Sequence, residues 1–198
     1  MSVLICIPTY ESIAAETFKS VYGQECSKEH GRPLFDFVKG YGCAQARNKA
    51  AKEALECGVD YLMFVDSDVI LPSNALNCLL EYDSDICVGI YPRRNTSCGQ
   101  TEVFLNTSYN FYDNNLNLNS IPSETRIDVK GGGMGCACIK TSLFKKLEYP
   151  YFRYVEHDDG ATLSEDNYFC WKAAEAGAKI QCDTRVRCKH KSEMWLSA

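Results

Sequence analysis

The sequence lacks the features that mark membrane-spanning, secreted or nucleic-acid-binding chains. No apolar run approaches the ~20 residues of a membrane-spanning helix, and the apolar run at residues 3–7 is too short for the core of a signal peptide. There is no long basic block, and the formal net charge is -5. Because sequence-independent binding to nucleic acid depends on neutralising phosphates, this charge argues against it, although a local basic patch is still compatible with it. We therefore expect no signal peptide and no membrane span.

The sequence also contains no Cys-x-x-Cys pair, although it has 12 cysteines. The usual beginning of a structural zinc site is therefore missing. Cys6, Cys87, Cys138 and Cys170 lie within apolar patterns, where a reduced thiol behaves as a small hydrophobic side chain. We predict reduced thiols in a cytoplasmic protein rather than the disulfide framework of a secreted one.

What the sequence does contain is the composition of an ordinary globular domain. Hydrophobic residues make up 45% and charged residues 24%, and both values are typical of soluble folded proteins. A chain of 198 residues is long enough to bury a sizeable core as one domain. Because no internal repeat or interdomain linker is evident, we predict a single domain over residues 1–198.

Strand and helix patterns alternate in the first half of the chain. Short apolar runs predict strands, and runs with apolar residues on one face predict helices. The predicted strands are residues 3–7, 35–39, 61–65 and 86–90, and the predicted helices are 14–24, 44–57 and 73–82. This alternation implies a mostly parallel sheet with right-handed crossovers, so the predicted fold class is α/β.

The rest of the chain changes character twice. Residues 91–127 are rich in Asn, Ser and Thr, and we predict here a small antiparallel elaboration over one side of the site. Its predicted parts are strands at 102–105 and 109–112 and a hairpin turn at 113–115. Regular patterns then resume, with predicted strands at 136–140, 180–182 and 186–189 and predicted helices at 142–147 and 165–176.

The most informative motif is Asp66-Ser67-Asp68, which directly follows the buried strand predicted at 61–65. In an open α/β sheet, ligands bind beyond the carboxyl ends of the strands. Two carboxylates at such an end suit a divalent cation that takes hard oxygen ligands and is shared with a phosphate. The same residues could form only a polar turn before Pro72, since Asp and Ser favour turns.

Two further motifs are predicted on the same side of the sheet. The Pro-Thr-Tyr-Glu segment at 8–11 follows the first strand, where it could hydrogen-bond to a nucleobase and stack on it. An ordinary Pro-initiated turn explains this segment equally well. Arg47 lies in the first turn of a predicted helix, where it could reach a diphosphate and where the helix dipole favours anions. An exposed Arg on a solvated helix face is the simpler interpretation.

Acidic and histidine side chains in the last third could complete a site. Glu165 and Asp166 open a predicted helix, and acidic residues are favoured there by the helix dipole alone. One of the two could also accept a proton from an attacking hydroxyl group. His190 follows the last predicted strand and could complete a metal site begun by Asp66 and Asp68, although a lone His is more often structural.

A glycine-rich segment, Gly131-Gly-Gly-Met-Gly135, precedes a predicted strand. It is not a phosphate-binding loop, because it lacks the Gly-Lys-Ser/Thr ending and is not followed by a helix. Repeated glycines instead predict close approach of another segment or a ligand to the backbone, and we interpret them as a wall that faces the acceptor.

In their order along the chain, these motifs resemble those of the GT-A glycosyltransferases, especially small family-2-like members. The matching segments are residues 8–11, 46–48, 64–68, 131–133 and 165–166, together with His190. The segment at 88–94 is similar to versions found in bacteriophages and large DNA viruses, so the cytoplasm would be that of a host cell if the chain is viral. The resemblance covers nearly the whole chain. It implies a GT-A-like, Rossmann-type sheet flanked by helices, with a nucleotide-binding half at 1–90 and an acceptor and catalytic half at 91–198.

The resemblance also implies a donor and a metal ion. The donor would be a nucleotide-diphosphate sugar, most simply a UDP-sugar, whose diphosphate is bridged by Mn²⁺ or Mg²⁺. Asp68 would ligate the metal directly, Asp66 would contact the ribose or the metal, and Ser67 would belong to the same donor-binding turn. His190 matches a late His that ligates the metal in some members of the family.

For the remaining motifs, the resemblance implies contacts with the nucleoside and with the acceptor. Pro8, Thr9, Tyr10 and Glu11 would line the nucleoside, and Arg47 would lie beside it or beside the diphosphate. Asp166, with Glu165 next in line, would be the base of an inverting transfer of a hexosyl or deoxyhexosyl group. The acceptor would be a hydroxyl group of a glycan, a glycoprotein or another molecule.

Other readings of the sequence remain open. A sugar nucleotidyltransferase can share this fold, but it would carry a Gly-rich, Arg-containing loop where residues 8–11 stand. A non-catalytic module that binds nucleotide sugars or glycans is the third possibility, and a retaining mechanism is compatible with the same motifs. The chain is short for the family and has no extra acceptor domain, so we expect it to work as part of a larger protein or assembly.

Overall fold

The computed structural model describes residues 1–27, 31–94, 99–105, 115–121, 125–158 and 160–192. The helices are α1 (Ala15–Tyr22), α2 (Cys43–Cys57), α3 (Ala75–Leu80), α4 (Thr141–Phe144) and α5 (Glu165–Glu175). The strands are β1 (Val3–Cys6), β2 (Leu34–Asp36), β3 (Tyr61–Val65), β4 (Val69–Ile70), β5 (Ile86–Ile90), β6 (Gln100–Phe104), β7 (Asn115–Asn117), β8 (Arg126–Asp128), β9 (Gly131–Gly132), β10 (Cys136–Lys140), β11 (Val155–Glu156), β12 (Thr162–Leu163), β13 (Ile180–Arg187) and β14 (Lys189–His190).

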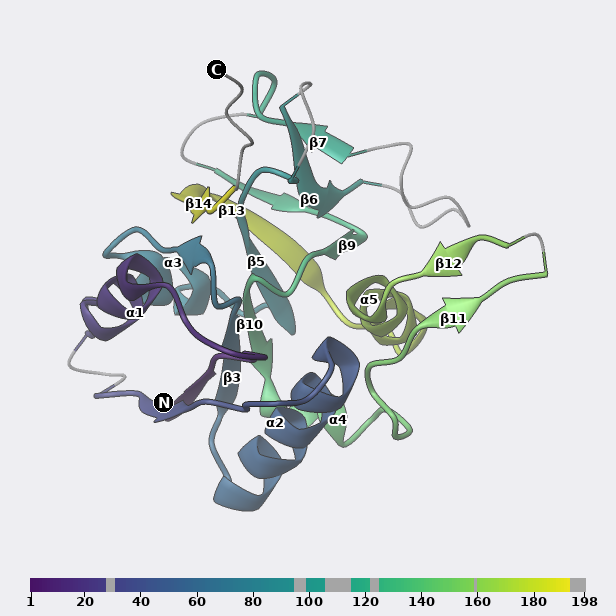
Figure 1. Ribbon diagram of the computed structural model, residues 1–198, viewed down its shortest axis with the longest axis horizontal. Helices are drawn as coiled ribbons and strands as arrows, with labels where there is room; N and C mark the ends of the chain where they lie inside the picture. Colours follow the sequence, from purple (N-terminus) through teal and green to yellow (C-terminus); the bar gives the residue numbers. More distant parts are fainter. Residues whose placement is uncertain (28–30, 95–98, 106–114, 122–124, 159, 193–198) are drawn as a thin grey trace.

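A seven-stranded sheet forms the centre of the fold (Figure 1). Its strand order is β2-β1-β3-β10-β5-β13-β8. Strands β2, β1, β3, β5 and β13 point in one direction, whereas β10 and β8 run antiparallel to their neighbours. The predicted α/β class with a mostly parallel sheet is therefore confirmed. The reversed direction of β10 was not predicted, because the uniform apolar run of a strand buried on both faces carries no information about its direction.

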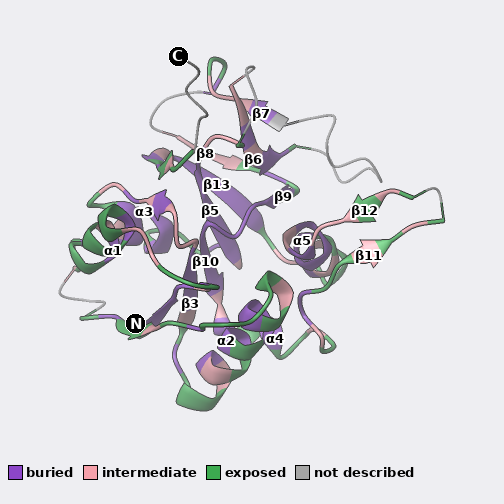
Figure 2. Ribbon diagram, viewed as in Figure 1, coloured by how far each residue is buried: buried purple, intermediate pink, exposed green. Residues whose placement is uncertain are grey.

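Helices cover both faces of this sheet. Alternate residues of β3 point to opposite faces: Leu62 and Phe64 pack with α2, α4 and α5, whereas Met63 and Val65 pack with α1 and α3. The central strands are buried, and the exposed residues of the helices face outward (Figure 2). A smaller antiparallel sheet in the order β7-β6-β9 lies beside the main one, as predicted for the middle of the chain.

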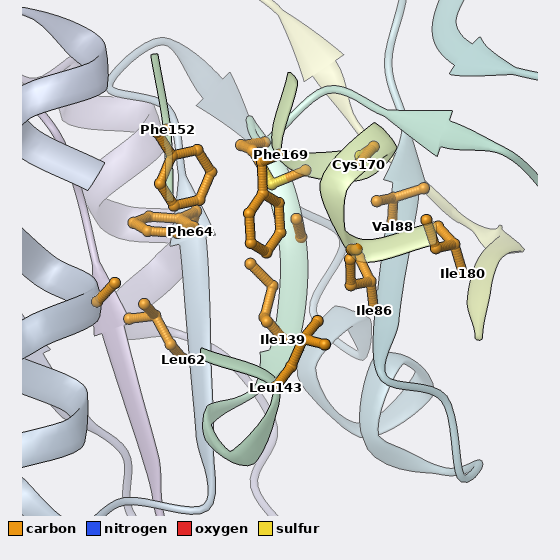
Figure 3. Close-up of a cluster of buried hydrophobic side chains, with 14 of the residues drawn as sticks. Leu62, Phe64, Ile86, Val88, Ile139, Leu143, Phe152, Phe169, Cys170 and Ile180 are labelled. Carbon is orange, nitrogen blue, oxygen red and sulfur yellow. The ribbon is translucent and has the colours of Figure 1, made fainter. Parts of the chain in front are cut away.

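Aromatic rings fill the core between the sheet and α5. The ring of Phe152 stacks on that of Phe169 with centroids 4.4 Å apart, and it meets Phe64 edge-on at 5.7 Å (Figure 3). All three side chains are almost completely buried. Since Phe64 is the next-to-last residue of β3 and Phe169 lies in the second turn of α5, this packing fixes the start of α5 next to the end of β3.

The predicted elements agree with the structure in type, with one clear exception. The strands at 61–65, 86–90 and 136–140 have the predicted bounds. The strand predicted at 180–182 is the start of β13, but the break predicted before residue 186 is wrong, because β13 continues to Arg187 with a register shift between Cys182 and Arg187. The strand predicted at 186–189 is divided between β13 and β14. The predicted break covers residues 183–185, of which the polar residues Asp183 and Thr184 are fully buried but hydrogen-bonded within the sheet region. The strand predicted at 109–112 and residues 113–114 of the predicted turn lie outside the described residues.

Two further predictions concern the state of the cysteines and the presence of membrane-spanning helices. The eleven cysteines in the described part of the chain are free, and Cys6, Cys87, Cys138 and Cys170 are buried, as predicted from their apolar surroundings. Within the described ranges, no helix combines the length and apolar character that crossing a bilayer requires.

Replacing Phe169 tests the importance of the aromatic core. We expect Phe169→Ala to lower the free energy of unfolding by about 3–5 kcal/mol, because it leaves a cavity between the sheet and α5. Phe18→Ala is the matched control, since Phe18 is 46% exposed, and it should cost less than about 1 kcal/mol. Urea denaturation followed by circular dichroism measures both changes. Equal losses in the two variants would contradict the assignment of Phe169 to the core.

Candidate active site

The carboxyl ends of the parallel strands meet at one edge of the sheet, and the predicted site residues are gathered near it. Residues 8–10 follow β1, residues 66–68 follow β3, and residues 91–94 follow β5. Strand β14 follows β13 and pairs with the short strand β4, which brings His190 opposite Val69. This edge is where open α/β sheets bind ligands.

The turn after β3 is held by backbone hydrogen bonds on both sides. The backbone N–H of Asp66 donates to the carbonyl oxygen of Gly135 at 3.1 Å, and that of Lys191 donates to the carbonyl oxygen of Asp68 at 2.9 Å. The second bond places His190 beside the turn, and its Nε2 lies 3.6 Å from Oδ1 of Asp68. Thus Asp68 and His190, which are far apart in the sequence, are brought together.

The imidazole of His190 is oriented by a backbone carbonyl. Its Nδ1 lies 2.8 Å from the carbonyl oxygen of Pro92, and we assign the ring proton to Nδ1 because a carbonyl can only accept. Nε2 is then left with a lone pair, and it accepts a hydrogen bond from Nε of Arg94 at 3.0 Å. Nη2 of the same guanidinium forms an ion pair with Oδ2 of Asp68. Asp68 and His190 therefore share one cationic partner.

Arg47 forms the buried centre of the site. Its side chain is 4% exposed and lies between two carboxylates, with Nη2 3.0 Å from Oδ1 of Asp66 and Nη1 paired with Oε1 of Glu165. Burial alone would lower the pKa of Arg47, but the nearby carboxylates raise it above its usual value. Arg47 is therefore a permanent cation that joins the end of β3 to the start of α5.

The two carboxylates at the start of α5 have different surroundings. Glu165 is 6% exposed and engaged with Arg47; burial raises the pKa of its carboxyl group, Arg47 partly offsets this rise, and Asp166 adds to it. Asp166 is half-buried, and its Oδ1 accepts hydrogen bonds from the Ser164 hydroxyl and the Asn167 N–H, the latter at 2.9 Å. Asp166 is thus the more accessible of the two predicted candidates for the base.

A pocket of about 200 Å³ opens beside the turn after β3. It is lined by Pro8, Thr9, Tyr10, Tyr41, Cys43, Asp66, Ser67, Asp68 and Arg94. Six of these nine residues were singled out from the sequence as parts of a donor site. Glu11 is exposed and, like Arg47, Asp166 and His190, does not line this pocket.

Glycines 133 and 135 allow a tyrosine to pack against the turn. A Cβ atom at Gly133 would lie 2.1 Å from Oη of Tyr91, and one at Gly135 would lie 2.8 Å from Cζ of Tyr91 and 2.9 Å from Oδ2 of Asp66. The Gly135 N–H donates to Oη of Tyr91 at 3.0 Å. The close approach predicted for this segment is therefore made by Tyr91 and Asp66 of the same chain.

Four residues of the site were missed in the sequence, and one of them, Cys43, lines the pocket from the start of α2. Tyr41 and Arg94 line the pocket, and both follow strands of the parallel set, so the rule that singled out residues 8–11 could have found them. Glu102 lies on β6 and pairs with Arg93 at 3.3 Å. Burial raises its pKa, Arg93 partly offsets this rise, and Asp166 adds to it, which places the two carboxylates within electrostatic reach. A single Glu in a polar segment carries no signal of this kind.

The side chains that could hold a metal ion are few. Among the described residues, no group of three or more His, Cys, Asp and Glu side chains converges on a common point. Asp68 and His190 supply one carboxylate and one imidazole nitrogen, and both already face a shared positive charge, that of Arg94. Such a mixed donor pair suits Mn²⁺ or Mg²⁺ when phosphate oxygens complete the coordination. The residues present therefore fit a metal that is shared with a ligand.

Comparison with known proteins identifies the fold. No protein-family model matches the sequence, and no curated protein matches it significantly. Solved structures do match: A197 from STIV has a TM-score of 0.68 and 18% identity, and the alignment covers 98% of this chain and 87% of that chain. GalNAc-T7 with UDP, GalNAc and Mn²⁺ has a TM-score of 0.64 and 12% identity over 97% of this chain. S. aureus TarS 1–349 in complex with UDP has a TM-score of 0.55 and 15% identity over 96% of this chain.

These likenesses show that the chain has the GT-A fold, as the sequence motifs implied. The chain spans only 44% of the GalNAc-T7 chain and 60% of the TarS chain. Its activity, donor and acceptor therefore do not follow from these comparisons and have to be inferred from the site.

The buried ion pairs of Arg47 predict a large stability effect. Arg47→Met keeps much of the side-chain volume but leaves Glu165 buried without its cation, so we expect a loss of about 3–5 kcal/mol in the free energy of unfolding. Adding Glu165→Gln should recover part of that loss, because it removes the uncompensated charge. Arg153→Ala, at an exposed position, should cost less than about 1 kcal/mol. Chemical denaturation checks all three, and an Arg47→Met variant as stable as the unchanged chain would contradict a structural role of the ion pairs.

Proposed function

We propose that this chain is a glycosyltransferase that transfers a hexosyl or deoxyhexosyl group from a nucleotide-diphosphate sugar to a hydroxyl acceptor, with a divalent metal ion and inversion at the sugar carbon. One observation carries the proposal: the side chains of Asp68 and His190 both contact the guanidinium of Arg94. Arg94 lines the pocket at the strand ends of a GT-A sheet. A polar turn without function would need no histidine from a distant strand.

The pocket would take the nucleoside and the diphosphate of the donor. Tyr10 is 72% exposed and Tyr41 44% exposed, and both line the pocket, where a base can stack on an aromatic ring. Asp66 and Ser67 line the same pocket, are less exposed than these tyrosines, and are suited to the ribose hydroxyls. UDP is the nucleotide in two of the similar structures, which favours a UDP-sugar.

Asp68 and His190 would hold the metal ion, with Asp66 close by. When bound, Mn²⁺ or Mg²⁺ supplies Lewis-acid stabilisation of the diphosphate that leaves the sugar. Pro92 keeps the His190 ring oriented through Nδ1, so that Nε2 stays directed at the site. Arg47 holds Asp66 in place from the buried side and thereby orients the whole turn.

Asp166 would act as the base. Within the described part of the chain, its two hydrogen bonds both go to Oδ1, and we therefore assign Oδ2 to accept the proton of the acceptor hydroxyl. Glu165 stands next to it but is bound to Arg47, so we assign it a positioning role. A carboxylate base that activates the acceptor for direct attack is the arrangement expected for inversion.

The remaining parts of the chain would serve the acceptor. Residues 1–90 carry most of the proposed donor site, and residues 91–198 contribute Asp166, His190 and the small β7-β6-β9 sheet beside them. The acceptor would be a glycan, a glycoprotein or another hydroxyl compound, with further contacts from a larger protein or assembly. The free buried thiols support work in a reducing compartment such as the cytoplasm.

Replacing Asp166 separates catalysis from binding. We expect Asp166→Asn to lower the rate of sugar transfer about 10²–10⁴-fold, because the proton acceptor is lost, and to leave the affinity for the donor unchanged. Asp158→Asn, at an exposed position, is the matched control and should leave the rate unchanged. Release of the nucleotide measures turnover, and calorimetry measures binding. An Asp166→Asn variant with full activity would contradict the assigned base, and donor binding without turnover in the unchanged chain would favour a binding module.

A further inference from the structure

Arg94 occupies the position between the two proposed metal ligands. Its Nη2 pairs with Oδ2 of Asp68, and its Nε donates to Nε2 of His190 at 3.0 Å. The guanidinium therefore uses the same lone pair of His190 and the same carboxylate that a metal ion would use. Because Nε2 of His190 has a single lone pair, a metal ion and Arg94 cannot both bind it.

The surroundings of Arg94 differ from those of the other arginine in the site. The Arg94 side chain is 55% exposed, whereas that of Arg47 is 4% exposed. Arg94 follows β5 and lines the pocket, so its long side chain can change partner without disturbing the core. Exposed ion pairs are weak because water competes for both charges. The contact of Arg94 with Asp68 and His190 is therefore exchangeable, whereas that of Arg47 is not.

We propose that Arg94 is a displaceable counter-ion, which occupies Asp68 and His190 before the metal binds and then transfers to the diphosphate of the donor. This inference rests on the proposed function and concerns the regulation of the same site. A guanidinium forms paired hydrogen bonds with phosphate oxygens as well as with carboxylates, and the pocket that Arg94 lines also contains Asp66 and Ser67. When the metal binds Asp68 and His190, the diphosphate thus replaces these two residues as the partner of Arg94.

The exchange has a thermodynamic consequence. Without nucleotide, the metal has to displace Arg94 into water, so Arg94 weakens metal binding. With nucleotide, the released Arg94 gains a phosphate partner, so it strengthens the ternary complex. Metal and nucleotide therefore bind with positive cooperativity, and by linkage each raises the affinity for the other by the same factor. His190 does not depend on Arg94 for its orientation, because the Pro92 carbonyl holds Nδ1.

Removal of Arg94 should consequently shift two affinities in opposite directions. In Arg94→Gln, Mn²⁺ without nucleotide should bind about fivefold more tightly, which is the size of one exposed ion pair. In the same variant, UDP at saturating Mn²⁺ should bind about tenfold more weakly, because a charge-assisted contact with the diphosphate is lost. A residue that only supported the loop would weaken both.

Isothermal titration calorimetry with Mn²⁺ alone, and with UDP in the presence of Mn²⁺, tests this directly. Arg93→Gln is the matched control: it removes the same charge from the neighbouring residue, which pairs with Glu102 instead, and it should change the Mn²⁺ affinity less than about twofold. Arg94→Lys keeps the charge but cannot reach both partners with one planar group, and it should give intermediate values. Thermal unfolding confirms that each variant is folded.

The outcomes separate the inference from the proposed function. Opposite shifts in Arg94→Gln, with Arg93→Gln unchanged, support the exchange of Arg94. If the unchanged chain binds Mn²⁺ and UDP but Arg94→Gln binds Mn²⁺ no more tightly, or if Arg93→Gln gives the same gain, the exchange is overturned and the proposed function stands. If the unchanged chain binds neither Mn²⁺ nor UDP, both are overturned.

Discussion

The buried guanidinium of Arg47 is the interaction on which the site depends. It joins Asp66, at the end of β3, to Glu165, at the start of α5, across 118 positions of sequence between Arg47 and Glu165. A charge buried to this extent is stable only when it is paired, so both carboxylates have to stay where they are. The turn that contains Asp68 and the first turn of α5 that contains Asp166 are held next to each other as a result.

Because Asp66 pairs with Arg47, Asp66 and Asp68 have different roles. Oδ1 of Asp66 is committed to Arg47, and the nearby Gly135 leaves room for Oδ2. Asp68 lies on the solvent side of the turn and faces His190 and Arg94. The two arginines thus differ in burial and hence in exchangeability: one is a fixed part of the fold, and the other is a partner that a ligand can replace.

The strand ends and the grouping of the donor residues could be predicted from the sequence, because they follow from local patterns. The apolar run at 61–65 predicts a buried strand, and the rule that ligands bind at carboxyl ends then brings residues 8–10 and 66–68 to one edge, where the structure has its pocket. The catalytic and binding roles of these residues remain predictions.

Features set by tertiary contacts could not be predicted in this way. The direction of β10 has no local signature, and a lone Arg47 was more simply read as an exposed side chain. Its burial depends on Glu165, which no spacing rule connects to it. The contact of His190 with Arg94 depends in the same way on the pairing of β14 with β4, two strands of two residues each.

The central claim is that the strand-end pocket binds a nucleotide sugar together with a divalent metal ion. Calorimetry of the unchanged chain against UDP-, GDP- and dTDP-sugars, with and without Mn²⁺, tests it most directly. We expect saturable one-to-one binding of one of these classes, most simply the UDP-sugars, that requires Mn²⁺ and is abolished in Asp68→Asn. Absence of metal-dependent binding to all three classes would contradict it.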